Sequence, residues 1–354
     1  MNKPLKKVVI VGGGSAGWLT AGIIAAEHIS DNNSAVEITL VESADVATVG
    51  VGEGTWPSMR STLKKMGISE TAFLLACDAS FKQGSKFSHW TTNTNEHYYH
   101  PFTLPRGFND INLAPYWQPF REKISFADAV CEQSHLGVQH RAPKQISTAE
   151  YAFSANYGYH LDAGKFSQFL QKHCTEKLHV KHIIDHVTHV NPAENNDIAS
   201  ISTKKNGEIS GDLFIDCTGS AAILLAKHYK IPFISKKQVL FNDSALAVHV
   251  PYSNDNSPIA SFTHSTAQTA GWIWDIGLPS RRGVGYTYSS SHISDEIAEK
   301  ALRSYISPSL GENAADTAMI RKIAINPGHR EKFWHKNCVA IGMAAGFIEP
   351  LEAS

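Results

Sequence analysis

The sequence predicts an α/β fold that is built on a dinucleotide-binding unit. A β-branched run at Lys7–Val11 is typical of a buried parallel strand. It leads directly into the glycine loop GGGSAG at residues 12–17, and a helical pattern follows over residues 18–27. A second apolar strand at residues 36–41 ends at Glu42. Strand, loop, helix, strand and carboxylate in this order are typical of a Rossmann-like βαβ unit.

Each residue of the glycine loop suits a dinucleotide. Gly12 permits the tight turn, Gly14 lets the backbone approach a pyrophosphate, and Gly17 lets helix and strand pack closely. Ser15-Ala16 opens the helix, whose free N–H groups and positive dipole end favour phosphate. Glu42 is placed to accept hydrogen bonds from a ribose. The alternative is a plain glycine turn beside a surface glutamate, and the pattern alone does not distinguish FAD from NAD.

Two later segments favour FAD. Residues 212–219 (DLFIDCTG) form an apolar strand that ends in a small-residue turn, after a predicted hairpin of Ile198–Thr203 and Glu208–Phe214. Residues 337–346 (NCVAIGMAAG) form another apolar strand that leads into glycine and alanine. Both resemble places where large FAD-binding folds return to the cofactor. We therefore expect a discontinuous FAD-binding domain that is built from the start, the middle and the end of the chain.

The composition is that of an ordinary globular protein. The chain has 354 residues, of which 42% are hydrophobic and 18% charged, and its formal net charge is -1. This charge gives no electrostatic case for nucleic acid or an anionic membrane. The five cysteines include no Cys-x-x-Cys pair, which indicates a reduced, cytoplasmic chain. Lysines before the apolar residues 8–26 imitate a secretory signal, but the glycine spacing inside that run argues against one.

Seven segments of the chain match a known family in their order. They are GGGSAGW (12–18), VGVGEGTWP (49–57), FKQGSKF (81–87), YHPF (99–102), YHLDAGKFSQFL (159–170), GWIWDIGLP (271–279) and AIGMAAGFIEPLE (340–352). In this order they resemble the flavin-dependent halogenases of the tryptophan-halogenase type, over essentially the whole chain. No single segment is decisive, but the shared order is improbable by chance.

The resemblance implies an FAD-binding, Rossmann-like fold of the flavin monooxygenase type, with an inserted substrate lobe of mixed sheet and loops. Such enzymes use reduced FAD and oxygen to form a flavin peroxide, which halide attacks to give hypohalous acid. The halogen, chloride- or bromide-derived, is then directed onto an electron-rich ring of the indole or tryptophan type. Val51, Gly52, Ile341 and Gly342 are expected to contact the cofactor. A separate flavin reductase is expected to supply reduced FAD, and a homodimer stays an open possibility.

Lys82 aligns with the family's essential lysine. An ammonium there would donate a hydrogen bond to hypohalous acid, whereas a deprotonated amine would form a haloamine. Without the resemblance it would be a surface lysine, and Lys86 lies further along the same expected helix. Glu352 aligns with the second essential residue, as a base for the proton that the ring loses. The halide is expected at Ala353 and Ser354, although the family commonly has serine in place of this alanine.

Four aromatic or imidazole side chains are candidates for the substrate passage. Trp272 and Trp274 belong to the family's Trp-x-Trp-x-Ile motif and are expected beside the flavin. The sequence alone also fits a strand whose aromatics pack into the core. His100 and Phe102 match the family's His-Pro-Phe, which sandwiches a flat aromatic substrate. The alternative there is a loop histidine and a core phenylalanine.

Two charged or titratable clusters carry no predicted chemistry. The segment HVKHIIDHVTHVNP is rich in β-branched residues, so it predicts strand, and a strand divides its histidines between two faces. We therefore expect no metal site at His179, His182, His186 and His189. Arg281-Arg282 is expected to lie in a solvated turn.

The order of the segments also predicts the domain organisation. We expect an FAD-binding domain over residues 1–90, 150–230 and 325–354, and a substrate lobe over residues 90–150 and 230–325. Chain ends normally lie at exposed positions, so we expect a helical C-terminal part to follow the active-site glutamate. Two rival functions stay open, a flavin-dependent aromatic monooxygenase and a non-catalytic FAD-binding remnant.

Overall fold

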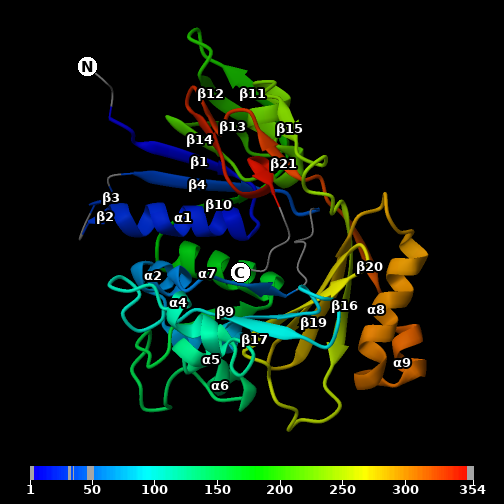
Figure 1. Cartoon of the computed structure of the whole chain (residues 1–354). Coiled ribbons are helices and arrows are strands. Elements are labelled where there is room, and N and C mark those ends of the chain that lie inside the picture. Colours follow the sequence, from blue (N-terminus) through cyan, green and yellow to red (C-terminus); the bar gives the residue numbers. More distant parts are fainter. Residues whose placement is uncertain (1–3, 31–32, 35, 46–51, 349–354) are drawn as a thin grey trace.

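Two large β-sheets dominate the structure, a computed structural model that describes residues 4–30, 33–34, 36–45 and 52–348. The six-stranded sheet lies in the upper half of Figure 1 and the seven-stranded sheet in the lower half. Helices α1 (Ser15–His28) and α7 (Ala163–Glu176) lie between them in this view. The remaining strands form short sheets of two or three strands around this frame.

The six-stranded sheet is parallel apart from one edge strand. Its order is β10 (Lys181–Ile184), β4 (Glu37–Glu42), β1 (Lys7–Val11), β14 (Leu213–Asp216), β23 (Cys338–Ala340) and β22 (Trp334–His335). Val9 on β1 lies opposite both Thr39 and Phe214. Strand β22 alone runs antiparallel to its neighbour within this sheet. Since both faces of β1 are covered, its residues are apolar along almost the whole strand rather than alternating.

This sheet confirms the predicted α/β class. The expected first strand, helix and second strand are β1, α1 and β4, and both predicted late strands, β14 and β23, join the same sheet. One expected boundary is wrong. The hairpin partner of β12 (Ile198–Thr203) is β13 (Gly207–Ser210), which ends before Phe214. Residues from Leu213 onward pair with β1 instead, because their apolar side chains are buried in the parallel sheet.

The seven-stranded sheet is antiparallel except where β17 meets β7. Its order is β20 (Arg321–Ala324), β16 (Ser244–Pro251), β19 (Arg281–Tyr288), β18 (Gly271–Gly277), β17 (Phe262–Gln268), β7 (Gly84–Ser88) and β8 (His97–Pro101). Successive side chains point to opposite faces of such a sheet. One face buries Ile273 and Tyr286 against α8 (Asp295–Leu310). Trp272 and Trp274 therefore lie on the other face.

Four short sheets complete the strands that the structure describes. They are β5 (Glu53–Gly54) with β9 (Gly158–Leu161) and β6 (Ser80–Lys82), β11 (Val187–Pro192) with β12 and β13, β15 (Phe233–Ser235) with β21 (Gly328–Arg330) and β24 (Gly346–Phe347), and β2 (Ile29–Ser30) with β3 (Asn33–Ser34). The first of these sheets carries Lys82 and connects to the seven-stranded sheet through Gln83.

The other helices are short and surround the sheets. They are α2 (Ser58–Lys65), α3 (Glu70–Ala76), α4 (Ala114–Trp117), α5 (Phe126–Val130), α6 (Gln133–Val138) and α9 (Glu312–Thr317). Polar side chains cap α7 and α8: the Asp162 carboxylate accepts the Lys165 N–H at 3.0 Å, and the Ser294 hydroxyl accepts the Ile297 N–H at 3.4 Å. No described helix is both long and apolar enough to cross a membrane.

The hydrophobic core lies on both faces of the parallel sheet. On one face Trp18 of α1 and Leu170 of α7 pack with Leu40 of β4. On the other face Val9 and Phe214 pack with the single turn of π-helix at Ile223–His228. The two clusters pack around β1, β14 and β23, and the candidate cofactor loop follows β1.

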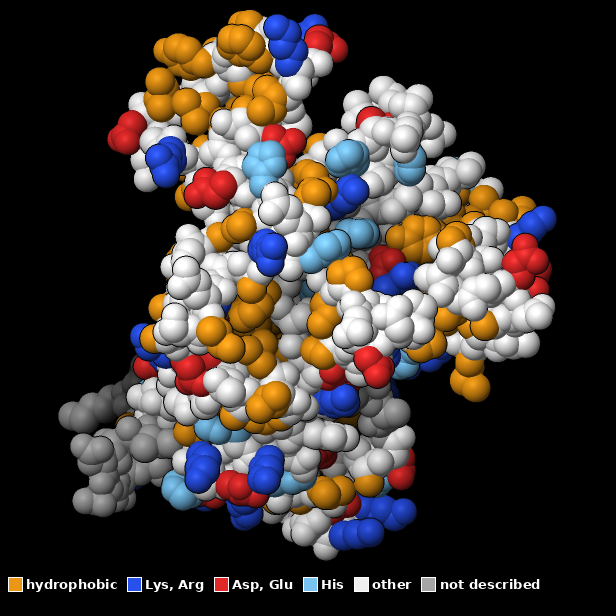
Figure 2. Space-filling model, turned by 90° about the horizontal axis from the view of Figure 1, so that it is seen from below, with side chains coloured by type: hydrophobic (Ala, Val, Ile, Leu, Met, Phe, Trp, Pro, Cys, Tyr) orange, Lys and Arg blue, Asp and Glu red, His pale blue; other side chains and the backbone are white. Residues whose placement is uncertain are grey.

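The surface is mixed in charge and carries exposed apolar side chains. Figure 2 views the molecule from the side on which α5 and α6 lie in Figure 1, and there Lys and Arg are interspersed with Asp and Glu. Hydrophobic side chains also reach this surface in several groups. Exposed large apolar residues are frequent over residues 104–146, namely Leu104, Phe108, Ile111, Tyr116, Phe120, Ile124, Val138 and Ile146.

Candidate active site

The glycine loop between β1 and α1 leaves space where a pyrophosphate is expected. Gly12 has a φ of 113°, and a Cβ there would lie 2.2 Å from the Cys217 carbonyl oxygen. A Cβ on Gly17 would lie 1.9 Å from the Gly12 carbonyl oxygen, so glycine is required for this close approach. A Cβ on Gly14 would have no atom within 4 Å. The loop therefore fits the phosphates of a dinucleotide, beside the free N–H groups that begin α1.

The late part of the chain returns to this loop. Gly342 has a φ of 67°, and a Cβ there would lie 2.9 Å from the Cβ of Ala16. The preceding Ile341 donates its backbone N–H to the Asp216 carbonyl at 3.0 Å. Ser15 begins α1, and its hydroxyl lies 3.0 Å from a serine hydroxyl of α7. The carboxyl ends of β1, β14 and β23 thus meet at one edge of the sheet, the edge at which such folds bind ligands.

Glu42 reaches back over the glycine loop from the end of β4. A Cβ on Gly13 would lie 1.6 Å from its Oε2, so the carboxylate covers that residue. Its Oε1 lies 2.6 Å from Nε2 of His182 on β10, and the His182 ring packs edge-on against Trp18. The sequence analysis did not identify this partner. No local pattern marks this partner, because β10 and β4 lie far apart in the chain and pair only in the fold.

The second expected cofactor segment reaches the seven-stranded sheet. Val51 lies outside the described residues. Gly52 has a φ of 97°, and a Cβ there would approach the Gly283 Cα at 3.6 Å and the Arg281 Nη1 at 4.0 Å. Residues of β19 therefore border the segment that follows Val51.

Arg281 and Arg282 do not lie in a solvated turn, so that expectation is wrong. Both belong to β19 and point to opposite faces of the sheet. Arg281 forms an ion pair with Asp162 at 2.7 Å, and Arg282 forms one with Asp275 at 3.2 Å. Their side chains are only 14% and 22% exposed. The two carboxylates, one capping α7 and one on β18, explain why this pair of cations is held inside the fold.

Lys82 is completely buried at the end of β6. Its Nζ lies 5.8 Å from the centre of the Phe102 ring. The expected helix over Lys82 and Lys86 is wrong, because the segment forms two strands in two different sheets. Lys86 lies on β7, partly exposed, with its Nζ 5.8 Å from the ring of Tyr99. Pairing with distant strands overrides local sequence here, and it places only the first of the two lysines in the interior.

Phe102 packs against Trp56. The two ring centres are 5.6 Å apart, with Phe102 buried and Trp56 49% exposed. His100 lies on β8 and is exposed. The structure thus brings Lys82, Phe102 and Trp56 together. Trp56 was missed as a site residue, although it lies within the matched segment VGVGEGTWP.

Trp272 and Trp274 are buried on one face of β18. Their rings are 6.3 Å apart, and Trp272 also lies 6.2 Å from Trp90. A Cβ on Gly285 of the neighbouring strand would lie 2.1 Å from Cζ2 of Trp274. Gly285 therefore makes room for the indole across the sheet. Nε1 of Trp274 is buried and has no hydrogen-bond partner among the described residues.

His160 is a buried histidine that the sequence analysis missed. Ser80 lies opposite His160 and Lys82 lies opposite Gly158, so His160 and Lys82 share one face of their antiparallel sheet. His160 is completely buried, and its Nε2 lies 2.9 Å from the Thr263 hydroxyl. Burial, and then the charges of Lys82 and His264, hold the pKa of His160 well below its ordinary value. The imidazole beside the lysine is therefore neutral.

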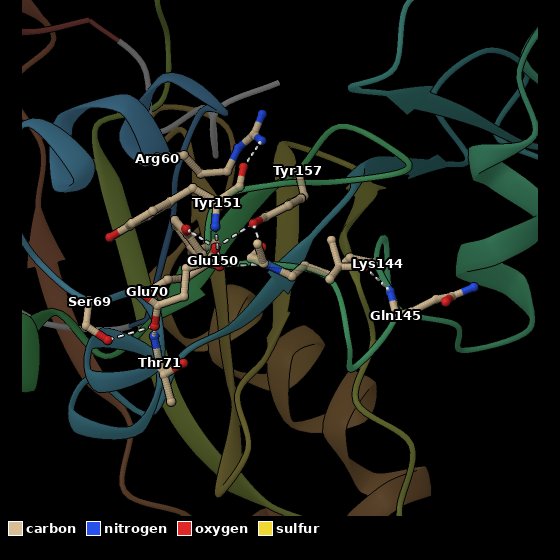
Figure 3. A network of polar contacts seen from close by, with 12 residues as sticks. Arg60, Ser69, Glu70, Thr71, Lys144, Gln145, Glu150, Tyr151 and Tyr157 are labelled. Carbon is tan, nitrogen blue, oxygen red and sulfur yellow. Dashed lines mark hydrogen bonds and ion pairs between the residues drawn. The ribbon is translucent and has the colours of Figure 1, made fainter.

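The opposite face of this sheet is anchored by Glu70. Its Oε1 accepts hydrogen bonds from the hydroxyls of Tyr157 and Tyr159, and its Oε2 accepts from Lys144 Nζ at 2.7 Å and the Tyr151 N–H at 2.8 Å. Figure 3 shows Lys144, Tyr151 and Tyr157 converging on this carboxylate. Burial opposes its ionisation, but these hydrogen bonds outweigh burial and keep the pKa of Glu70 below its ordinary value. Glu70 thereby connects Lys144 and Tyr151 to Tyr159 of β9, the strand that pairs with Lys82.

The histidine-rich segment forms β10 and β11, as predicted. In the part of the chain that the structure describes, no group of three or more His, Cys, Asp or Glu side chains is placed to hold a metal ion. Glu352, Ala353 and Ser354, the expected base and halide residues, lie outside the described residues.

Comparison with known proteins identifies the family. A family model described as tryptophan halogenase matches residues 7–354. The chain belongs to the tryptophan halogenase family. The resemblance carried by the seven sequence segments is therefore confirmed, and the chain is an enzyme of the flavin-dependent halogenase class.

Individual relatives match the chain over nearly its full length. Tryptophan 6-halogenase SttH of Streptomyces toxytricini is 34% identical, and the match covers 98% of this chain and 68% of that protein. The crystal structure of a tryptophan halogenase from Shewanella frigidimarina NCIMB 400 is 58% identical, with a TM-score of 0.95, and covers 99% of this chain and 68% of that chain. A flavin-dependent halogenase from Xanthomonas campestris is 33% identical, with a TM-score of 0.86, and covers 99% of this chain and 68% of that chain. The shared fold confirms the predicted fold class.

Proposed function

We propose that this enzyme halogenates an electron-rich aromatic ring of the indole or tryptophan type, using reduced FAD, oxygen and chloride or bromide. The observation that carries the proposal is Lys82, a completely buried lysine beside the ring of Phe102 in a family member. Burying a lysine is costly, so a lysine in an interior position indicates a role. Two similar proteins are named tryptophan 6-halogenase and 7-chloro-L-tryptophan 6-halogenase, which supports a substrate of the tryptophan type.

The residues around the glycine loop fit FAD. Gly12, Gly14 and the start of α1 would hold its pyrophosphate, since Gly14 opens onto free space. Glu42 would accept from the ribose with the carboxylate oxygen that His182 leaves available. Gly52, Ile341 and Gly342, with Val51, would border the remainder of the cofactor. When bound and reduced, FAD supplies the electrons with which oxygen and halide give hypohalous acid.

Lys82 would direct the halogen. As an ammonium it donates a hydrogen bond to the oxygen of hypohalous acid, which makes the halogen atom more electrophilic. As a neutral amine it would carry the halogen itself as a haloamine. Glu352 would accept the proton that the ring loses, and the halide would bind at Ala353 and Ser354. His160 takes no proton in this scheme, because its pKa lies well below the ordinary value.

The aromatic side chains would have two roles, substrate stacking and the exclusion of water. Phe102 and Trp56, 5.6 Å apart, offer ring faces against which a flat indole can stack, with His100 at the exposed rim. Trp272 and Trp274 line a dry face of the seven-stranded sheet and would keep water from the oxidant. Their part in the reaction is exclusion and packing, not proton transfer.

A halide requirement tests this proposal. The protein would be mixed with FAD, a flavin reductase and NADH, and then offered indole or free tryptophan with chloride, bromide or no halide. Mass spectrometry is expected to find monohalogenated product only when halide is present. Hydroxylated product without halide would establish the monooxygenase instead. Bound FAD with no product under any of these conditions would favour the non-catalytic remnant.

A further inference from the structure

Two completely buried glutamines are hydrogen-bonded to each other, and one of them is the residue after the candidate lysine. Gln83 and Gln133 are both 0% exposed, and no catalytic or binding role has been assigned to either. Gln83 directly follows Lys82 in the matched segment FKQGSKF, whereas Gln133 begins α6 and lies outside all the matched segments. Buried polar groups are almost always hydrogen-bonded, so the partners of the two side-chain amides show which segments they connect.

Gln133 joins three separate segments with one amide group. Its Oε1 accepts the Thr103 N–H at 2.8 Å. Its Nε2 donates to the Asn156 carbonyl at 2.5 Å and to Oε1 of Gln83 at 3.3 Å. Gln133 thus bonds to the residue after Lys82, to the residue after Phe102 and to the segment that leads into β9.

Gln83 fixes the backbone that carries Lys82. Its Nε2 donates to the Arg141 carbonyl at 2.8 Å and to the Ser261 hydroxyl at 3.0 Å. Its own backbone carbonyl accepts the Phe102 N–H at 3.0 Å. The peptide group next to Lys82 is therefore bonded directly to the peptide group of Phe102.

Asn156 closes the arrangement from the other side. Its Nδ2 donates to the Phe102 carbonyl at 3.0 Å, and its backbone N–H donates to the Thr103 hydroxyl at 2.9 Å. Its side-chain oxygen accepts from Arg60. Phe102 is thus held through both its N–H and its carbonyl, and Gln133 bonds to both of the segments that hold it.

We propose that Gln133 is a positioning residue that sets Lys82 against the ring of Phe102, and so aims the halogenating group at the bound ring. Only a primary amide satisfies the observed set of partners, with one acceptor for an N–H and two donors for two carbonyl oxygens. Glutamate retains the acceptor but places a carboxylate oxygen against two acceptors. Methionine retains the length and removes all three hydrogen bonds. This inference rests on the proposed function, because its consequence is measured as halogenation.

The test compares Gln133→Met and Gln133→Glu with the wild-type protein and with Gln139→Met, a matched control at the exposed end of the same helix. Each full-length protein would be loaded with FAD and given reductase, NADH, bromide and free tryptophan or indole. Two quantities are measured, the halogenated product formed per NADH consumed and the dissociation constant for FAD. Circular dichroism establishes that each variant is folded.

Product per NADH is expected to fall by about 10- to 100-fold in Gln133→Met, since small displacements of a reacting group have effects of that size. A smaller loss of product is expected in Gln133→Glu, and none in Gln139→Met. The affinity for FAD is expected to stay within about twofold, because the hydrogen bonds of the Gln133 side chain go to Gln83, Thr103 and Asn156 and not to the glycine loop. A folded Gln133→Met or Gln133→Glu protein with wild-type product per NADH would overturn the inference. If Gln133→Met does not fold, Gln133→Glu decides the question. A wild-type protein that forms no halogenated product would overturn the proposed function, and the positioning role with it.

Discussion

Replacement of Glu70 by glutamine is predicted to destabilise the fold strongly. Glutamine keeps an oxygen for the hydroxyls of Tyr157 and Tyr159, but its Nε2 would face two donors, Lys144 Nζ and the Tyr151 N–H. Glu70 is 2% exposed, so little water is available to replace the lost bonds. Each buried donor left without a partner costs about 1–3 kcal/mol, and the charged one lies at the upper end. The expected loss in the free energy of unfolding is about 3 kcal/mol.

Urea unfolding followed by circular dichroism measures this loss. With an m value of about 3 kcal/mol/M, a loss of about 3 kcal/mol moves the midpoint by about 1 M. Glu150→Gln is the matched control, because this exposed carboxylate caps α3 through Ser69 and the Thr71 N–H in the same cluster (Figure 3). Its midpoint is expected to move much less.

The pH dependence gives the Glu70 prediction a sign. The pKa of Glu70 is lowered in the fold, so its contribution is present above the ordinary carboxyl value of 4.5 and is lost as the pH falls below that value. The gap between wild type and Glu70→Gln should therefore narrow in acid. A midpoint that does not move at neutral pH, or a gap that widens on acidification, would refute the reasoning.

Three further predictions concern other buried groups. The pKa of His160 in the fold lies well below 6.5, so the free energy of unfolding of the wild-type protein should fall by up to about 1.4 kcal/mol per pH unit below pH 6.5. His160→Asn should lose less stability over the same range, which an acid-unfolding titration measures. All five cysteines are buried, and burial raises the pKa of the Cys77, Cys174 and Cys217 thiols to about 12. A thiol reagent should therefore label the cysteines only after unfolding, and rapid labelling of the native protein would contradict this. Gly285→Ala would place a Cβ 2.1 Å from the Trp274 ring. The free energy of unfolding should fall by about 1–3 kcal/mol, with a lower melting temperature and altered tryptophan fluorescence. An unchanged melting temperature would show that the ring is not packed there.

The sequence was sufficient for the nucleotide-binding end of the fold. The strand at Lys7–Val11, the glycine loop and the helix after it follow from local residue patterns, and the structure confirms each of them. The late strands at β14 and β23 were also predicted, because each is an apolar run that ends in small residues. The expected domain boundaries and the roles of the site residues stay predictions.

The errors occur where distant residues decide the outcome. Lys82 and Lys86 were expected on one helix, but pairing with β9 and β17 places them on two strands. Arg281 was expected in solvent, and its partner Asp162 lies more than a hundred residues earlier. Contacts across such separations leave no local pattern in a single sequence.

The missed site residues have the same physical origin. Gln133 and His160 carry no motif, and their importance depends on which backbone groups surround them in the fold. Trp56 lay in a matched segment, but only the folded chain shows that its ring meets Phe102.

The central claim is that Lys82 directs halogenation, and its replacement by methionine tests this most directly. Lys82→Met and Lys86→Met would be compared with the wild-type protein for halogenated product, for FAD binding and for reductase-dependent oxygen consumption. Methionine fills the buried site without an amine, and Lys86 is a partly exposed control in the same segment. We predict that Lys82→Met lowers product by about 100-fold or more while FAD still binds and oxygen is still consumed, and that Lys86→Met stays close to wild type. A folded Lys82→Met protein that halogenates at the wild-type rate would contradict the account.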